Sequence, residues 1–293
     1  MSPSPPLRYA VVTPARNERD NIERLAAALA AQDHAPTWWV IADDGSTDGT
    51  REFGLELAAS DPRIRVETRT AATGGLSDGR RQARDLLAFQ HGIRRLPEPV
   101  DVVVKVDADV SVEADFFARL LDWFAREPGL AIAGGACTEW QDGAWVRRKI
   151  VPSAVWGATR AYRAEVLDVA LALAPNVGWD GIDEIQVQLR GWKTGTDITL
   201  PFRHHRPEGL REGKLVRAHI LSGEAAWYMG YRPSYLVLRS LYRARADRAA
   251  LGLMWGYGAG ALRRAPRCPD ADVIQVLRRR QRLSVAFRGG TPE

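Results

Sequence analysis

Short aliphatic runs alternate with segments of helical periodicity along the first half of the chain. Runs such as YAVVTP and WWVIADD are apolar at nearly every position, whereas segments such as IERLAAALAAQ repeat their apolar residues every three to four positions. Strand and helix signals follow each other four times between Tyr9 and about Gly135. Near-continuous aliphatic strands joined by helices are typical of a parallel sheet covered on both faces. The pattern predicts an α/β fold with a mostly parallel sheet flanked by helices.

The pattern changes after about Gly209. The later segments are helical, aromatic and rich in arginine, as in AAWYMGYRPSYLVLRSLYRARADRAALGLMWGYGAGALRRAP. We therefore predict one domain over residues 1–208 and a helical C-terminal appendage over residues 209–293. No apolar run reaches the roughly 18 residues of a membrane span. Helices of this composition also suit a membrane surface. Two interpretations therefore stay open: the C-terminal helices contact a membrane peripherally, or they cap the α/β domain.

Composition and charge limit the cellular compartments and the classes of partner that we expect for this protein. The chain is 45% hydrophobic and 26% charged, as in ordinary globular proteins. Its start lacks the basic and apolar stretches of a secretion signal, and Cys137 and Cys268 have neither disulfide-framework nor zinc-site spacing. We expect a cytoplasmic protein, at the inner face of the membrane if the C-terminal helices bind there. The net charge of +5 is modest, and no nucleic-acid-binding motif is present, so we predict no nucleic-acid partner.

Polar residues gather where the predicted strands end. Arg16, Asn17 and Glu18 follow the first strand, and residues 43–48, DDGSTD, follow the second. Turn formation and helix capping explain each group taken alone. In open α/β sheets, however, ligands bind beyond the carboxyl ends of the strands. Acids clustered at one sheet edge therefore indicate a ligand that meets a cation there.

Asp107 and Asp109 end the fourth aliphatic run, and Ser111 with the acids after it predicts that a helix begins there. Burying an ionised carboxylate without a partner costs several kcal/mol. Because Mg²⁺ or Mn²⁺ binds through one or two carboxylates plus substrate phosphates, we predict that the pair holds one of these ions against a diphosphate. His204 and His205 follow the predicted strand TDITL and are candidates for further metal ligands, with ordinary surface histidines as the alternative.

Four segments in sequence order resemble the family 2 inverting glycosyltransferases with the GT-A fold: PARNE, ADDGSTDGT, VKVDADVS and the acid-bearing helix in GWDGIDEIQVQLRGWKTG. The resemblance covers roughly residues 8–206. It implies a Rossmann-like GT-A sheet. It also implies transfer of a sugar from a nucleoside diphosphate sugar donor to a hydroxyl-bearing acceptor, with inversion at the anomeric carbon and help from a divalent metal.

The resemblance also implies roles for individual residues. The donor would contact Pro14, Ala15, Asn17, Glu18, Asp44, Gly45, Asp107 and Ala108. Within this set Asp107 would approach the ribose and the metal, while Asp109 would coordinate the metal that bridges both phosphates.

The catalytic base of the family usually belongs to a Glu-Asp pair that opens a helix, eleven residues before a glycine and an aromatic residue. Counting back from Gly191 reaches Asp180, which follows Trp179 in place of the usual glutamate. Asp180 is therefore the preferred base, and Asp183, one turn later, is the alternative.

Two other classes of protein share parts of this pattern. A sugar-phosphate nucleotidyltransferase has an α/β sheet with metal-binding acids, but it ordinarily carries a glycine-rich basic loop near its first strand, and PARNERDN has no glycine. A catalytically inactive GT-A-like binding module would not need the acids at 107, 109 and 180.

Family acceptors range from polysaccharides to lipid-linked carriers and small molecules, and the fold alone does not indicate which acceptor this chain uses. The loop GGLSDGR, residues 74–80, is expected either to close over the donor or to be a plain surface loop.

Overall fold

The structure is a computed structural model that describes five segments of the chain: residues 6–69, 82–141, 143–149, 154–206 and 215–282. Residues 74–80, expected either to close over the donor or to be a plain surface loop, lie outside these segments. The chain divides into two compact units, which are described separately here. The first unit comprises residues 1–73, 84–173 and 187–207, and the second comprises residues 74–83, 174–186 and 208–293. A boundary near residue 208 remains a prediction.

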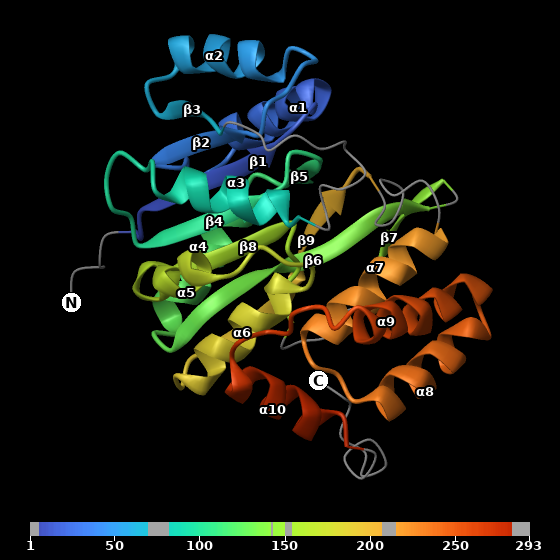
Figure 1. Cartoon of the computed structure of the whole chain (residues 1–293). Coiled ribbons are helices and arrows are strands. Elements are labelled where there is room, and N and C mark those ends of the chain that lie inside the picture. The colour runs from blue at the N-terminus through green and yellow to red at the C-terminus, as the bar shows by residue number, and fades with distance from the viewer. Residues whose placement is uncertain (1–5, 70–81, 142, 150–153, 207–214, 283–293) are drawn as a thin grey trace. The chain divides into compact units, whose positions relative to one another are not determined.

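A nine-stranded sheet forms the centre of the first unit (Figure 1). Its strands are β1 (Tyr9–Ala15), β2 (Trp38–Asp43), β3 (Ile64–Thr68), β4 (Val102–Val106), β5 (Val110–Val112), β6 (Leu130–Gln141), β7 (Ala144–Arg147), β8 (Thr159–Arg163) and β9 (Lys193–His204). They lie in the order β3-β2-β1-β4-β8-β6-β9-β5, and β7 pairs with β6. Strands β3, β2, β1 and β4 are mutually parallel, as are β6 and β9, whereas β8 runs antiparallel to its neighbours.

Helices cover both faces of this sheet. They are α1 (Arg19–Ala30), α2 (Thr50–Ser60), α3 (Arg84–Ile93), α4 (Phe116–Arg126) and α5 (Leu167–Ala172). Apolar residues of α1 and α4 share one core with Tyr9 and Val11, and those of α3 and α5 share a second core with Ala10 and Val12. Because successive strand residues point to opposite faces, β1 serves both cores. The predicted α/β fold with a flanked sheet is confirmed.

The segment after Asp109 differs from the sequence-based prediction. No helix begins at Ser111. Instead Val110–Val112 forms β5, whose register with β9 pairs Val110 with His204, and α4 begins only at Phe116. β-branched residues favour this half-buried extended conformation. The short strand therefore joins the aspartate pair to the end of β9.

The second unit is helical over its described residues. It holds the start of α6 (Trp179–Leu189), followed by α7 (Leu215–Tyr228), α8 (Pro233–Ala244), α9 (Gly252–Leu262) and α10 (Ala271–Arg280). Helices α7 and α9 pack backbone to backbone, since a Cβ on Gly256 would collide with the carbonyl oxygen of Ile220. Among the described residues, no helix is both long and apolar enough to cross a membrane. The predicted helical character of the C-terminal part is thus confirmed.

Candidate active site

The loops that follow β1 and β2 are bound to each other. Asn17 has a left-handed φ of 55°, a conformation that asparagine tolerates better than most residues. Its side-chain oxygen accepts a hydrogen bond from the Thr47 N–H at 2.8 Å, and its own N–H donates to Ser46 Oγ at 3.0 Å. The Glu18 N–H donates to Thr50 Oγ1 at 2.8 Å. These bonds fix the polar residues at the first two strand ends.

Four other predicted donor residues belong to this edge or lie next to it. Pro14 and Ala15 are the last two residues of β1, and Ala15 accepts a backbone hydrogen bond from Asp44 at 2.8 Å. Gly45 has a φ of 76° and donates its N–H to Asp43. Ala108 is buried between the two aspartates that follow β4. Their part in donor binding stays a prediction.

Asp44 is a buried carboxylate surrounded by arginines. Arg69 donates a hydrogen bond to it, while guanidinium nitrogens of Arg16 and Arg84 lie 3.7 and 3.8 Å from its Oδ2. Burial raises the pKa of Asp44 above its ordinary value, and the charges of Arg69 and Arg16 offset only part of that rise. Three guanidinium groups around one acid leave an excess of positive charge that suits a phosphorylated or carbonyl-bearing ligand.

Asp107 is paired with a buried lysine. Lys105, on β4, is 1% exposed and donates to Asp107 and to the carbonyl oxygen of Gly157. Its Nζ also lies 3.6 Å from an oxygen of Asp85 on α3. The charge of Asp107 is therefore balanced within the protein, while 25% of its side chain stays exposed to a ligand.

Asp109 lies deeper and faces two other cationic groups. Its Oδ2 is 3.2 Å from Arg206 Nε, and its Oδ1 is 3.5 Å from His204 Nε2. Arg206 also donates to Glu18. Residues from the ends of β1, β4 and β9 thus meet at this point, and the β5–β9 pairing explains why His204 is among them.

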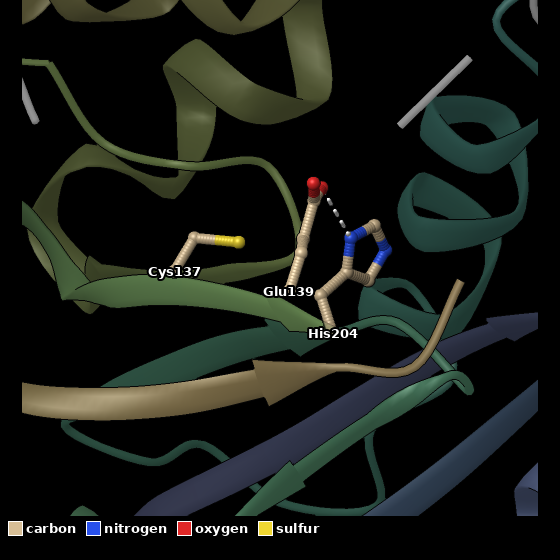
Figure 2. Close-up of side chains that lie close together, drawn as sticks. All are labelled: Cys137, Glu139 and His204. Atoms are coloured by element: carbon tan, nitrogen blue, oxygen red, sulfur yellow. Dashed lines mark hydrogen bonds and ion pairs between the residues drawn. The ribbon is translucent and has the colours of Figure 1, made fainter. Parts of the chain in front are cut away.

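His204 has a second carboxylate on its other side (Figure 2). Its Nδ1 lies 3.5 Å from Glu139 Oε1. Burial alone would lower the pKa of His204, but hydrogen bonds to Asp109 and Cys137 and the charges of Asp109 and Asp107 raise it to about 10. Cys137, Glu139 and His204 each offer one potential ligand atom, and these atoms lie within 4.8 Å of one another.

His205 has different surroundings. Its Nε2 is 2.8 Å from Ser111 Oγ, and its ring meets the Trp145 ring edge-on with centroids 5.3 Å apart. Burial, together with the charge of Arg24, lowers the pKa of His205. The backbone N–H of His205 donates to the Asp109 carbonyl oxygen, but of the two predicted histidine ligands only His204 brings its imidazole to the Asp109 carboxylate.

The potential ligand atoms of Asp109 and His204 suit a divalent ion. Carboxylate oxygens are hard ligands, and an imidazole nitrogen is accepted more readily by Mn²⁺ than by Mg²⁺. The 3.5 Å between Asp109 Oδ1 and His204 Nε2 is close to the roughly 3 Å that separates adjacent ligands in an octahedral shell at about 2.1 Å from the ion. Ion binding would require His204 in its neutral form.

The two candidates for a catalytic base lie in the second unit, on α6. Asp180 is half-buried in the first turn of this helix. Asp183 is fully buried, and its Oδ1 accepts the N–H of Glu184 at 2.6 Å. The contrast in exposure favours Asp180, because a base must reach the acceptor. Both assignments stay predictions.

Sequence reasoning did not single out Lys105, Glu139 or Arg206. Lys105 gives a visible signal, since it interrupts the aliphatic run VVVKV just before the aspartate pair. Arg206 stands directly after the two histidines. Glu139 lies within β6 without any turn or motif signal, and only the pairing of β6 with β9 reveals its position opposite His204.

Comparisons with known proteins give a family and a fold. Residues 10–171 match the family described as Glycosyl transferase family 2. The polyprenol monophosphomannose synthase of Mycolicibacterium smegmatis is 32% identical over 187 residues, which cover 56% of this chain and 64% of that protein. The chain thus matches less than two thirds of this relative's length.

Two solved structures share the architecture at low sequence identity. The mannosyltransferase PcManGT from Pyrobaculum calidifontis, in complex with GDP-Man and Mn²⁺, is 19% identical, with a TM-score of 0.56 over 98% of this chain and 82% of that chain. S. aureus TarS 1–349, in complex with UDP-GlcNAc, is 15% identical, with a TM-score of 0.55 over 75% of this chain and 66% of that chain. These likenesses show the GT-A fold.

Proposed function

Because the chain belongs to glycosyl transferase family 2, we propose that it transfers mannose from GDP-mannose to a polyprenyl phosphate, with inversion at the anomeric carbon. The named activity of the Mycolicibacterium smegmatis relative supports this acceptor, and the GDP-Man complex of PcManGT supports this donor. Family membership also favours a transferase over the nucleotidyltransferase alternative.

The strand-end residues are suited to hold the donor. Asp44 would accept hydrogen bonds from the guanine base, with Arg16 and Arg69 beside it to meet carbonyl or phosphate oxygens. Asp107, held by Lys105, would accept a hydrogen bond from the ribose. These roles follow from the chemistry of each side chain and from the binding of ligands beyond strand ends.

The diphosphate end of the donor would lie near Asp109. We propose that Asp109 and His204 hold a divalent ion, with Mn²⁺ favoured by the imidazole and by the ion found with PcManGT. When bound, such an ion supplies positive charge that stabilises the departing diphosphate. Arg206, whose side chain is 33% exposed beside Asp109, offers additional donors to the same phosphates.

The acceptor chemistry decides how much a catalytic base matters. A phosphate monoester has a second pKa near 6 and is mostly ionised at neutral pH. Its oxygen attacks without losing a proton, and the bond from the anomeric carbon to the nucleoside diphosphate breaks as the new bond forms. A hydroxyl acceptor would instead need Asp180 to take its proton. A lipid phosphate has no such proton for Asp180 to remove.

The second unit supports an acceptor that resides in a membrane. Large apolar side chains of α8 and α9 are exposed: Val237, Leu238, Leu241, Tyr242, Trp255 and Leu262. Within each helix their spacing places them along one stripe. Residues 209–293 hold 16 of the 41 lysines and arginines but 6 of the 36 acids, so this part carries a formal charge of +10 and residues 1–208 carry −5. Apolar stripes with basic surroundings suit an anionic lipid surface.

One observation carries the proposal: Asp107, Asp109 and His204 converge at the ends of β4 and β9 in a chain of this family. Labelled GDP-mannose, incubated with the full chain, Mn²⁺ and polyprenyl phosphate, tests it. We expect label to move into the organic phase, and UDP-linked sugars to transfer little. Label that stays in water-soluble product, or transfer only from a UDP-sugar, would contradict the proposed acceptor or donor.

A further inference from the structure

We propose that Glu139 is a positioning residue that orients His204, so that Nε2 of the imidazole faces Asp109 and the site gains affinity for Mn²⁺. The inference rests on the proposed function, in which Asp109 and His204 hold a divalent ion. It concerns a residue near the C-terminal end of β6, outside the four segments that carry the family resemblance.

The sheet places Glu139 and His204 directly opposite each other. They are register partners in the parallel β6–β9 ladder, so their side chains leave the same face of the sheet (Figure 2). Glu139 Oε1 lies 3.5 Å from His204 Nδ1, and Asp109 Oδ1 lies 3.5 Å from His204 Nε2. The imidazole therefore lies between two carboxylates, with one for each ring nitrogen.

Burial makes this arrangement costly unless every charge has a partner. Glu139 is 1% exposed, and an ionised carboxylate at such a depth costs several kcal/mol without compensation. Arg148 Nε lies 3.4 Å from Oε2, whereas Oε1 faces His204. The two oxygens thus serve different partners.

The chemistry of metal-bound histidines explains how the Glu139 carboxylate would assist metal binding. A ligating histidine almost always donates its second N–H to a carboxylate, a carbonyl or water, which fixes the tautomer and the ring orientation. With the Nδ1 proton directed at Glu139, His204 would keep the Nε2 lone pair for an ion bound beside Asp109. Loss of such a partner typically lowers metal affinity by about 10- to 100-fold.

Cys137 offers a rival arrangement on the same face. Its sulfur, Glu139 and His204 form a set that a softer ion such as Zn²⁺ prefers. In that case Glu139 would itself be a ligand. The substitution Cys137→Ser distinguishes this arrangement from the proposed one, because it removes the sulfur and leaves the carboxylates and the imidazole in place.

The test is Mn²⁺ binding to the full chain, measured by calorimetry for the wild type, Glu139→Gln, Cys137→Ser and Asp109→Asn. Glutamine keeps the shape of Glu139 without its charge, and thermal unfolding checks that each variant folds. We expect Glu139→Gln to weaken Mn²⁺ binding about 10- to 100-fold, and Cys137→Ser to leave it unchanged. Saturating Mn²⁺ should restore the turnover of Glu139→Gln, which it would not do for a merely structural defect.

A spectroscopic measurement on the wild type keeps the test independent of variant folding. Electron spin echo modulation should show a nitrogen bound to Mn²⁺. Absence of that nitrogen signal overturns the proposal. Unchanged Mn²⁺ affinity in Glu139→Gln overturns the role of Glu139 but not the metal site itself. If Cys137→Ser loses as much Mn²⁺ affinity as Glu139→Gln, the proposal is overturned in favour of a thiol-containing site. A wild type that binds no Mn²⁺, or binds it without a nitrogen ligand, would overturn the inference together with the proposed metal site.

Discussion

Asp180 illustrates how one side chain can discriminate between two acceptors. If the acceptor is a lipid phosphate, its oxygen is already ionised at neutral pH, so Asp180→Asn should lower turnover by less than about 10-fold. General-base help to a hydroxyl is worth about 10²- to 10⁴-fold, and a loss of that size would point to a hydroxyl acceptor. Turnover at saturating donor and acceptor decides between them, with Asp272→Asn, an acid of α10, as the matched control.

Tyr9 makes the stability of the first unit sensitive to alkali. It is fully buried, and its hydroxyl donates to the His34 carbonyl at 2.7 Å. Burial raises its pKa above the ordinary 10.0, although the charge of Arg63 lowers it slightly. Because the unfolded chain loses this proton first, stability that is present below pH 10 is lost as the pH rises, by up to about 1.4 kcal/mol per pH unit.

The substitution Tyr9→Phe tests this linkage. It should cost about 1 kcal/mol at neutral pH through the lost hydrogen bond, and it should flatten the fall in stability at alkaline pH. Urea unfolding of both proteins between about pH 7 and about pH 11 measures the two slopes. Equal alkaline losses would show that Tyr9 ionises as readily in the folded protein as in the unfolded chain.

At the scale of elements, the pairing of β6 with β9 fixes the site. Gly135 lies where the register of the two strands shifts, and a Cβ there would collide with the Leu200 carbonyl oxygen and come 2.8 Å from the Phe116 ring. Gly135→Ala should therefore destabilise the protein by about 1–3 kcal/mol. Gly258→Ala is the matched control, because its Cβ meets no atom within 4 Å in α9 and it should stabilise by up to about 1 kcal/mol. Equal unfolding free energies for the two variants would contradict this packing.

The elements also show what could be predicted from the sequence. Strands β1 to β4 were predictable because each is a local aliphatic run followed by an amphipathic helix or a turn. Strand β5 was not, since three residues gain their strand character from β9, more than 80 residues later. Glu139 was not predictable either, because it carries no local signal and its partner His204 lies 65 residues later. Asp109 was predictable as a candidate ligand, but its contacts with His204 and Arg206 depend on long-range pairing.

At the scale of the whole molecule, the opposite charges of the N-terminal and C-terminal parts predict association with anionic membranes. The full chain should float with vesicles that contain anionic lipid, and less so at high salt, because the attraction is screened. Trp255→Ala should weaken flotation, since this side chain is 72% exposed on α9. Trp140→Ala removes a tryptophan that is 50% exposed in the first unit and serves as the control. Equal flotation of both variants would contradict a contact through α9.

The central claim is that an ion at Asp109 holds the diphosphate of the donor. Calorimetric titration of GDP-mannose into the full chain, with and without Mn²⁺, tests it most directly when the Asp109→Asn variant is measured alongside. The account predicts that binding depends on Mn²⁺ in the wild type and that this dependence disappears in the variant. GDP-mannose binding that is equally strong without Mn²⁺, or unchanged in Asp109→Asn, would contradict it.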